Sequence, residues 1–161
     1  ARLVPTIGAV AGKCVPTWWF DAPHPPARHH ALVIEPQPGA GPVANTLVMS
    51  NAAPRLAPAG RHLVQASVVA DRQQSVTDAA VLAHVSRLWA VPTDGWSVVT
   101  RHHVAHALPD QRPPLVLRRP VEVEPGLYVC GDHRDTGSIQ GAMASGHRTA
   151  AVVAAHLRRR S

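Results

Sequence analysis

Short apolar runs separated by proline-rich turns fill the first 70 residues of the chain. The run over residues 13–20 is apolar and β-prone, and it stops at a proline-rich stretch over residues 21–26. Three further runs follow, over residues 31–35, 45–50 and 62–70. Because turn residues separate these runs at short spacing, the pattern predicts four strands that pair in antiparallel fashion.

The period of the apolar positions changes after residue 75. The stripe at helical spacing consists of Val81, Leu82, Val85, Leu88 and Trp89. Before it, Ser75 to Asp78 has the form of a capping box in which the Ser75 side chain accepts backbone N–H bonds. The pattern predicts a helix over residues 76–90 that ends near Pro92 and packs against a core.

The last third of the chain predicts two strands and a long helix. Residues 96–108 alternate like a strand, and the apolar run over residues 126–130 is typical of a buried parallel strand. A loop over residues 132–137 precedes a helix predicted over residues 138–157. We expect this helix to bury a stripe made of Ile139, Ala142, Met143, Gly146, Ala150, Val153 and Leu157.

Composition fits a folded domain. Of the 161 residues, 45% are hydrophobic and 16% charged, which argues against a disordered tail. No apolar stretch approaches the roughly 18–20 residues of a membrane span. The two cysteines, Cys14 and Cys130, have no CxxC spacing and make no disulfide framework. We therefore expect a reducing, cytoplasmic setting without an export signal or a membrane span.

The net charge of +6 raises the question of a nucleic-acid partner. Only Lys13 is a lysine, the arginines are scattered except at the very end, and one Tyr and one Phe supply a poor stacking platform. We expect no nucleic-acid partner.

The spacing of the histidines argues against a metal site, and several catalytic and nucleotide-binding motifs are absent from the sequence. His102 and His106 would lie about 13 Å apart on a strand, with His103 on the opposite face, so we expect no metal site there. The sequence contains no HExxH, GxSxG, GxxxxGK[ST] or GxGxxG pattern. It therefore holds no dinucleotide fingerprint of its own.

One segment, residues 126–153, combines a strand, an acidic turn and a helix that begins with small residues. Gly131 and Asp132 follow the strand directly. A carboxylate there can accept hydroxyl donors, and the N–H groups of a helix start suit an electron-rich partner. Two rows of small residues let a backbone or a flat ligand approach: Gly137, Gly141 and Ser145, and Ala142, Gly146 and Ala150. The alternative is that these residues only pack a helix on a sheet.

This segment resembles the C-terminal FAD-binding segment of the flavin-containing amine oxidase and phytoene desaturase superfamily. Weaker similarity at residues 57–63 and 96–109 extends the resemblance over about two-thirds of the chain. The resemblance implies a fold of the α/β class, present here as a mixed α+β fragment. Residues 1–121 would supply antiparallel strands of a substrate-domain sheet. Residues 122–161 would supply the strand and helix that complete a Rossmann-like FAD domain. It also implies an FAD-dependent oxidoreductase that removes a hydride from a C–N or C–C bond of a small-molecule substrate.

The resemblance also assigns site residues. Gly131 and Asp132 would meet the ribityl or pyrophosphate part of FAD. The residues beside the pyrimidine edge of the flavin ring would be Ser138, Ile139, Gln140, Gly141 and Ala142. Lys13 is similar to the amine oxidase lysine that holds a water against the flavin. The alternatives are an ordinary surface lysine at 13 and an Asp132 that only accepts N–H bonds from Thr136 or Gly137.

Complete members of the superfamily carry an N-terminal GxGxxG loop for the ADP half of FAD, which this sequence lacks. We therefore expect the chain to resemble only the last part of such an enzyme, with the missing FAD-binding part as a partner if it is a separate chain. The alternative function is that of a remnant or accessory chain that binds a partner and has no redox activity alone.

Overall fold

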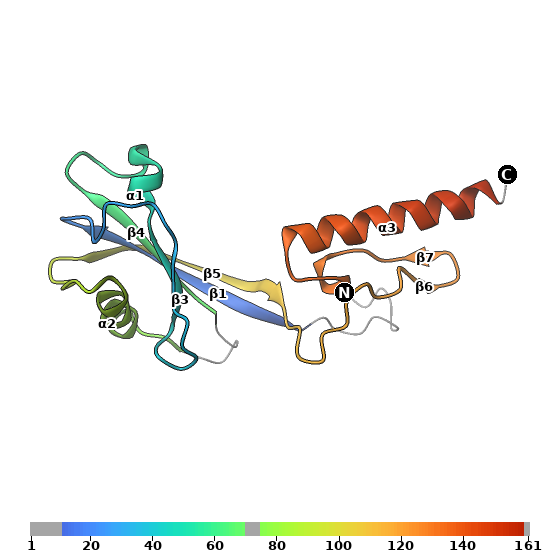
Figure 1. The fold of residues 1–161 in the computed structure, drawn as a ribbon, viewed down its shortest axis with the longest axis horizontal. Coiled ribbons are helices and arrows are strands. Elements are labelled where there is room, and N and C mark those ends of the chain that lie inside the picture. The colour runs from blue at the N-terminus through green and yellow to red at the C-terminus, as the bar shows by residue number, and fades with distance from the viewer. Residues whose placement is uncertain (1–10, 70–74, 160–161) are drawn as a thin grey trace. The chain divides into compact units, whose positions relative to one another are not determined.

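The computed structural model describes residues 11–69 and 75–159, and the chain divides into two compact units. We call residues 13–107 the sheet unit. Residues 1–12 and 108–161 form the other, which we call the helix unit. Both are drawn in Figure 1, and each is described by itself. The predicted mixed α/β class with antiparallel strands is confirmed.

The sheet has five strands in the order β2-β3-β4-β1-β5. They are β1 (Gly12–Ala22), β2 (Val33–Ile34), β3 (Val43–Val48), β4 (His62–Val68) and β5 (Ser97–Pro109). β1 and β3 both pair with β4 in antiparallel register, as the turn spacing predicts. The run over residues 45–50 ends earlier than expected, because Met49–Ala52 turns into a short helix, α1, which leads to the 3-10 turn η1 (Pro54–Leu56). Residue 70, the expected end of β4, lies outside the described residues.

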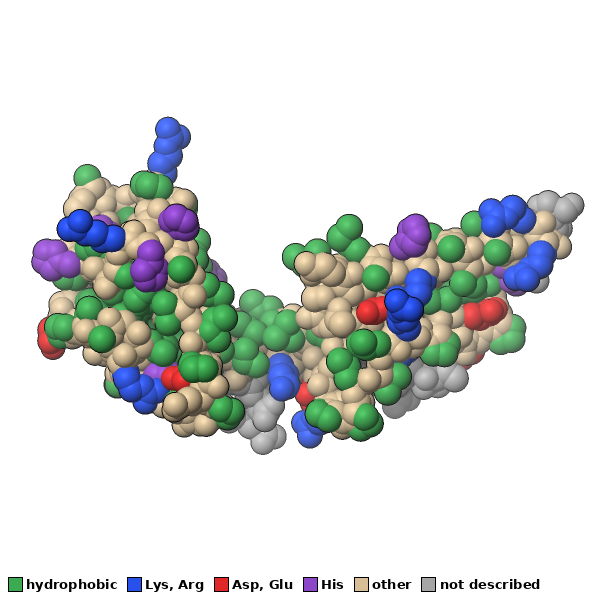
Figure 2. All heavy atoms as spheres, viewed as in Figure 1, with side chains coloured by type: hydrophobic (Ala, Val, Ile, Leu, Met, Phe, Trp, Pro, Cys, Tyr) green, Lys and Arg blue, Asp and Glu red, His purple; other side chains and the backbone are tan. Residues whose placement is uncertain are grey.

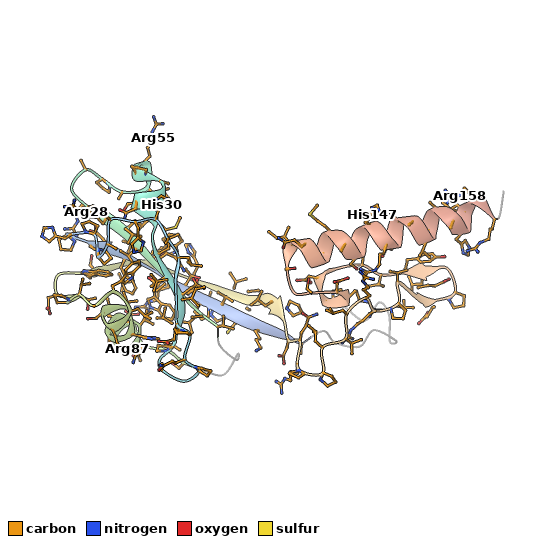
Figure 3. The ribbon with its side chains drawn as sticks, in the orientation of Figure 1. Arg28, His30, Arg55, Arg87, His147 and Arg158 are labelled. Carbon is orange, nitrogen blue, oxygen red and sulfur yellow. The ribbon has the colours of Figure 1, made fainter. Side chains whose placement is uncertain are left out.

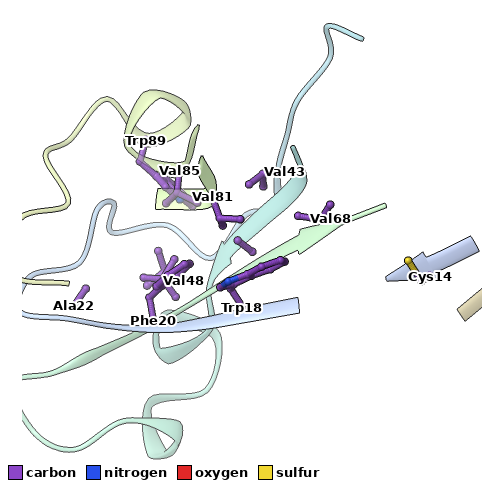
Figure 4. Packing of buried hydrophobic residues seen from close by; sticks show 12 residues of the cluster. Cys14, Trp18, Phe20, Ala22, Val43, Val48, Val68, Val81, Val85 and Trp89 are labelled. Carbon is purple, nitrogen blue, oxygen red and sulfur yellow. The ribbon is translucent and has the colours of Figure 1, made fainter. Parts of the chain in front are cut away.

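One face of this sheet packs against α2 (Asp78–Trp89), as Figure 4 shows. Trp18, Phe20 and Val48 contribute from the sheet, and Val81 and Val85 contribute from the helix. All five side chains are buried, and burial of each aliphatic or aromatic side chain contributes about 1.5–3 kcal/mol. The helix stripe read from the sequence therefore forms the core.

Two tryptophans in this core also anchor polar groups. Trp18 Nε1 donates to Asp78 Oδ1 over 2.8 Å, and Trp89 Nε1 donates to Thr46 Oγ1 over 3.1 Å. A buried indole N–H needs such an acceptor, because leaving it unpaired costs free energy.

The N-cap of α2 is Thr77, so the expectation that Ser75 caps this helix is wrong. Thr77 Oγ1 accepts from Ala80 N over 3.2 Å, while α2 begins two residues later than the predicted start at 76. Ser75 stands too far before the first turn to reach its amides. Ala90 ends the helix in a left-handed conformation with φ of 52°, before Pro92.

A buried histidine, which the apolar stripe does not include, connects α2 to the start of β3 and to Glu35 before it. His84 Nδ1 accepts from Val43 N over 2.9 Å, and its Nε2 lies 2.9 Å from Glu35 Oε2. The acceptor role of Nδ1 leaves the proton on Nε2, which donates to the carboxylate. A Cβ at Gly41 would lie only 2.3 Å from this ring, so the segment needs glycine there.

Glu35 is stabilised as a carboxylate by this network. The N–H of Gln37 donates to it over 2.9 Å, and His84 and Arg87 add further donors. These interactions, that of Gln37 first, hold the pKa of Glu35 below its ordinary value, against a smaller opposing effect of burial.

The helix unit begins its regular structure with a hairpin and not with a parallel strand. β6 (Glu122–Glu124) pairs with β7 (Leu127–Tyr128) in antiparallel register, and Gly126, with φ of 76°, makes the turn. The expectation of a buried parallel strand over residues 126–130 is therefore wrong. In the described part of this chain the apolar run has only the adjacent β6 segment to pair with.

The long helix is confirmed as α3 (Ile139–Arg158), after a 3-10 turn, η2 (Asp132–Arg134). Its predicted buried stripe is wrong, since Ile139 is 79% exposed, Met143 71% and Leu157 60%. The side that is buried carries Gly141 and Ser145 and packs against η2. Periodicity locates an apolar face, but it does not say whether this chain supplies the surface that covers it.

The two compact units separate between residues 107 and 108. The predicted functional boundary, between residues 121 and 122, stays a prediction. No helix in the described ranges is long and apolar enough to cross a membrane.

The cap assignment can be tested by stability. We expect Thr77→Ala to lower the free energy of unfolding by about 1 kcal/mol, because the Ala80 amide loses its acceptor. Ser75→Ala is the matched control and should change stability by no more than about 0.5 kcal/mol. Urea unfolding followed by circular dichroism measures both. A larger loss of stability in Ser75→Ala than in Thr77→Ala would contradict this assignment and would indicate that Ser75 is the N-cap.

The Glu35 network predicts a particular acid sensitivity. A carboxyl whose pKa is lowered by folding adds stability above its unfolded pKa and loses it as the pH falls through the folded value. We therefore expect Glu35→Gln to flatten the fall in melting temperature below a pH of about 4.5. Exposed Asp94, changed to Asn, is the control and should leave the profile unchanged. Identical acid profiles for Glu35→Gln and the unmodified chain would contradict this account.

Candidate functional site

The chain enters the segment before α3 through Gly131. Its φ of 146° lies in a region that L side chains rarely adopt, and a Cβ there would come within 2.6 Å of the His133 ring. Its N–H donates to Ser145 Oγ on α3 over 3.2 Å. Glycine is thus required by the turn itself, and Ser145 fixes the turn to the helix.

Asp132 keeps part of its carboxylate available. Oδ1 accepts from His133 N over 2.7 Å, the side chain is 38% exposed, and Oδ2 makes no hydrogen bond within the described part of the chain. His133, which is partly buried beside Arg134, has its pKa lowered, first by burial.

Asp132 does not cap the loop through Thr136 or Gly137. Thr136 N donates to Asp135 Oδ1 over 3.0 Å, and Gly137 N donates to Gln111 Oε1 over 2.8 Å. That alternative for Asp132 is wrong, and other side chains fill the capping role.

Ser138 is the N-cap of α3. Its Oγ accepts from Gly141 N over 3.0 Å and lies 2.9 Å from Thr136 Oγ1. The first turn of this 20-residue helix contains no acidic residue, whereas basic side chains lie in its last turn. The positive end of the helix dipole is therefore not neutralised by a side chain of its own first turn.

Gly141 is buried and packs closely against the loop before α3. A Cβ at this position would lie 1.9 Å from the Thr136 carbonyl oxygen, so no other residue fits without moving the backbone. The resemblance places Gly141 beside the flavin ring together with its neighbours, and that role stays a prediction. Ile139, Gln140 and Ala142 are exposed on the first turns of α3 and are the members of that set whose side chains a ligand can reach.

An ion pair that the sequence pattern does not predict joins the turn to the middle of the helix. Asp135 and Arg148 form a short pair, and Gln111 Nε2 donates to the Asp135 carbonyl over 2.6 Å. The Arg148 guanidinium holds the pKa of Asp135 below its ordinary value, although burial of the carboxyl opposes this. Asp135 and Arg148 are 13 residues apart, with a turn between them, and no helix or strand periodicity predicts that such positions lie close together. The sequence alone therefore gives little indication of the pair.

Lys13 lies on β1, half-buried, in the sheet unit. Asp132 and α3 belong to the helix unit, so the proposed lysine and the proposed cofactor segment are described separately. The role of Lys13 stays a prediction.

One of the histidines on β5, His102, accepts a hydrogen bond from a neighbouring strand. Trp19 Nε1 donates to His102 Nδ1 over 2.9 Å. Across residues 11–69 and 75–159, no group of three or more metal-ligating side chains is placed to hold an ion.

Comparisons with known proteins agree with this architecture. A family model for flavin-containing amine oxidoreductases matches residues 14–154. The chain is similar to the solved structure of reduced UDP-galactopyranose mutase, with a TM-score of 0.57 and 14% identity over 89% of this chain and 34% of that one. It is also similar to an oxidoreductase from Methanosarcina mazei, with a TM-score of 0.49 and 19% identity over 88% of this chain and 34% of that one. No curated protein matches it.

The chain spans about a third of the length of each of these two solved structures. The family match covers most of the chain, from β1 into the second half of α3. The chain belongs to the family of flavin-containing amine oxidoreductases.

Proposed function

We propose that this chain is the substrate-sheet and cofactor-closing part of an FAD-dependent oxidoreductase, and that the start of α3 faces its cofactor. The observation that carries the proposal is the capped, acid-free first turn of α3. It exposes Ile139, Gln140 and Ala142 directly after the Gly131–Asp132 turn. Membership of a flavin-containing family supports the choice of cofactor.

The residues present fit a flat, electron-rich group. Ala142 is exposed and small, and a Cβ added at Gly146 would meet no atom within 4 Å, so space is open above these two helix positions. Asp132 Oδ2 is available to accept a hydroxyl donor such as those of a ribityl chain. The segment thus offers a small surface, an acceptor and the positive end of a helix dipole.

When bound, FAD would supply the chemistry, namely acceptance of a hydride from a C–N or C–C bond of a small-molecule substrate. The start of α3 would favour negative charge that develops beside it, because its dipole end is positive. Asp132 would orient the cofactor by accepting hydroxyl hydrogen bonds. Lys13, a compact amine, would hold a water molecule.

The ADP half of FAD requires a separate binding element in this proposal. The 161 residues contain no GxGxxG sequence, and the chain covers only 34% of the similar solved structure of UDP-galactopyranose mutase. We propose that an N-terminal FAD-binding part, on the same or another chain, holds that half.

Titration of the 161-residue chain with FAD tests this division of the cofactor. We expect binding weaker than about 10 μM, since the contacts to the ADP half are missing and each 1.4 kcal/mol of lost interaction weakens binding tenfold. Quenching of FAD fluorescence gives the dissociation constant. A submicromolar value would show that this chain needs no second binding element.

The cofactor-facing surface is tested by Ala142→Leu in a flavin-loaded enzyme that contains this segment. We expect at least about tenfold weaker flavin retention, because the larger side chain occupies the surface that the ring would cover. The flavin absorbance near 450 nm measures the retention. Gly141→Leu is unsuitable, since a Cβ there collides with the Thr136 carbonyl in the absence of any cofactor.

Ala151→Leu is the matched control, because Ala151 is also exposed on α3 but lies more than two turns further along. It should retain flavin fully. Equal retention by Ala142→Leu and Ala151→Leu, with the helix intact by circular dichroism, would contradict the proposed surface. Such a result would favour the remnant or accessory function.

A further inference from the structure

A cavity in the helix unit lies outside the segment assigned to the cofactor. It is open to solvent and has a volume of about 630 Å³, within the usual range of pockets for small ligands. Its lining residues are Arg118, Asp135, Met143, Ala144, His147 and Arg148. They come from the segment before β6, the turn before α3 and one side of α3, so one compact unit builds the whole cavity.

The charges in this cavity are not balanced. Asp135 is engaged by Arg148, which leaves Arg118 as a second guanidinium without a hydrogen-bonded partner within residues 11–69 and 75–159. Apart from His147, the cavity has two guanidiniums and one carboxylate, which leave one excess positive charge. Figure 2 shows basic and acidic side chains side by side on this unit.

Arg118 and Arg148 both have unused capacity to donate. Arg118 is exposed and has a φ of 51°, a left-handed conformation that is uncommon for any residue but glycine. Strained residues of this kind cluster at ligand sites. In the Arg148 guanidinium, Nη2 is buried and has no hydrogen-bond acceptor in the part of the chain that the structure describes. The cavity is thus rich in donors and poor in acceptors.

The rim of the cavity is apolar. Met143 is 71% exposed, and Ala144 beside it is also exposed. A ligand that satisfies both regions carries an anionic head and an apolar body.

We propose that this cavity binds an amphipathic monocarboxylate, with its carboxylate between Arg118 and Arg148 and its apolar chain along Met143. A guanidinium fork matches a carboxylate in shape and charge. A single negative charge matches the single excess positive charge, whereas a phosphate dianion would be repelled by Asp135. The proposal goes beyond the flavin function and needs no cofactor.

Calorimetric titration of the 161-residue chain with octanoate tests the proposal. We expect saturable binding, and at least about tenfold weaker binding for Arg118→Asn, which loses the charge-assisted contact. Asparagine is chosen because it tolerates the left-handed backbone at this position. The matched control is Arg158→Asn, a change of the same charge near the far end of α3, which should bind as the unmodified chain does. Figure 3 labels Arg158 and the cavity residue His147 on this helix.

Ala144→Asp provides a second variant that leaves Arg118 in place. It adds a negative charge at an exposed lining position and should also weaken octanoate binding, with helix content unchanged by circular dichroism. Octylamine, which has the same chain and the opposite charge, should not bind.

Several results would overturn the proposal. These are the absence of saturable octanoate binding, equal affinity in Arg118→Asn and Arg158→Asn, or binding of octylamine as tight as that of octanoate. Inorganic phosphate that binds more tightly than octanoate would also overturn it, and would indicate a phosphate site in its place.

Discussion

The close approach of the Thr136 carbonyl to Gly141 determines how the chain presents α3. Because no Cβ fits between them, the loop closes against the first turn of the helix, and Ser138 is held where its side chain caps Gly141. The same packing turns Ile139, Gln140 and Ala142 toward solvent. The exposed helix start on which the proposed function rests is therefore a consequence of one backbone contact.

Electrostatic interactions reinforce this arrangement further along the helix. Asp135 lies between the turn and α3, where its hydrogen bond with Arg148 lowers its pKa below the ordinary value. Gly131 adds a second attachment through Ser145. Both attachments use polar groups on the buried side of α3. On the apolar side of α3, the side chains of Ile139, Met143 and Leu157 are mostly exposed.

The sequence predicts the positions of the helices and strands better than their caps and their buried faces. Alternation and helical spacing located β1, β4, α2 and α3, because these patterns are local. The α2 cap shifted by two residues because Ser75 and Thr77 are equally good cap residues, and only the helix start distinguishes them. The α3 stripe was misassigned because burial depends on a partner surface, which periodicity does not supply.

In the candidate site, too, local features were predicted from the sequence, whereas contacts between distant positions were not. The resemblance identified the Gly131–Asp132 turn and the α3 start, but it could not distinguish buried Gly141 from exposed Ala142. Gln111 and the Asp135–Arg148 pair were missed, since they act through contacts between positions 13 or more residues apart in the sequence. The family assignment rests on a match over residues 14–154 and agrees with the resemblance of the last segment.

Hydrogen–deuterium exchange gives the most direct test of the claim that the start of α3 faces the cofactor. The measurement compares flavin-loaded with flavin-stripped enzyme that contains this segment. The account predicts that bound flavin slows exchange of the amides of residues 139–142, while those of residues 150–157 exchange at unchanged rates. Unchanged exchange at residues 139–142, with slowing confined to other segments, would contradict it.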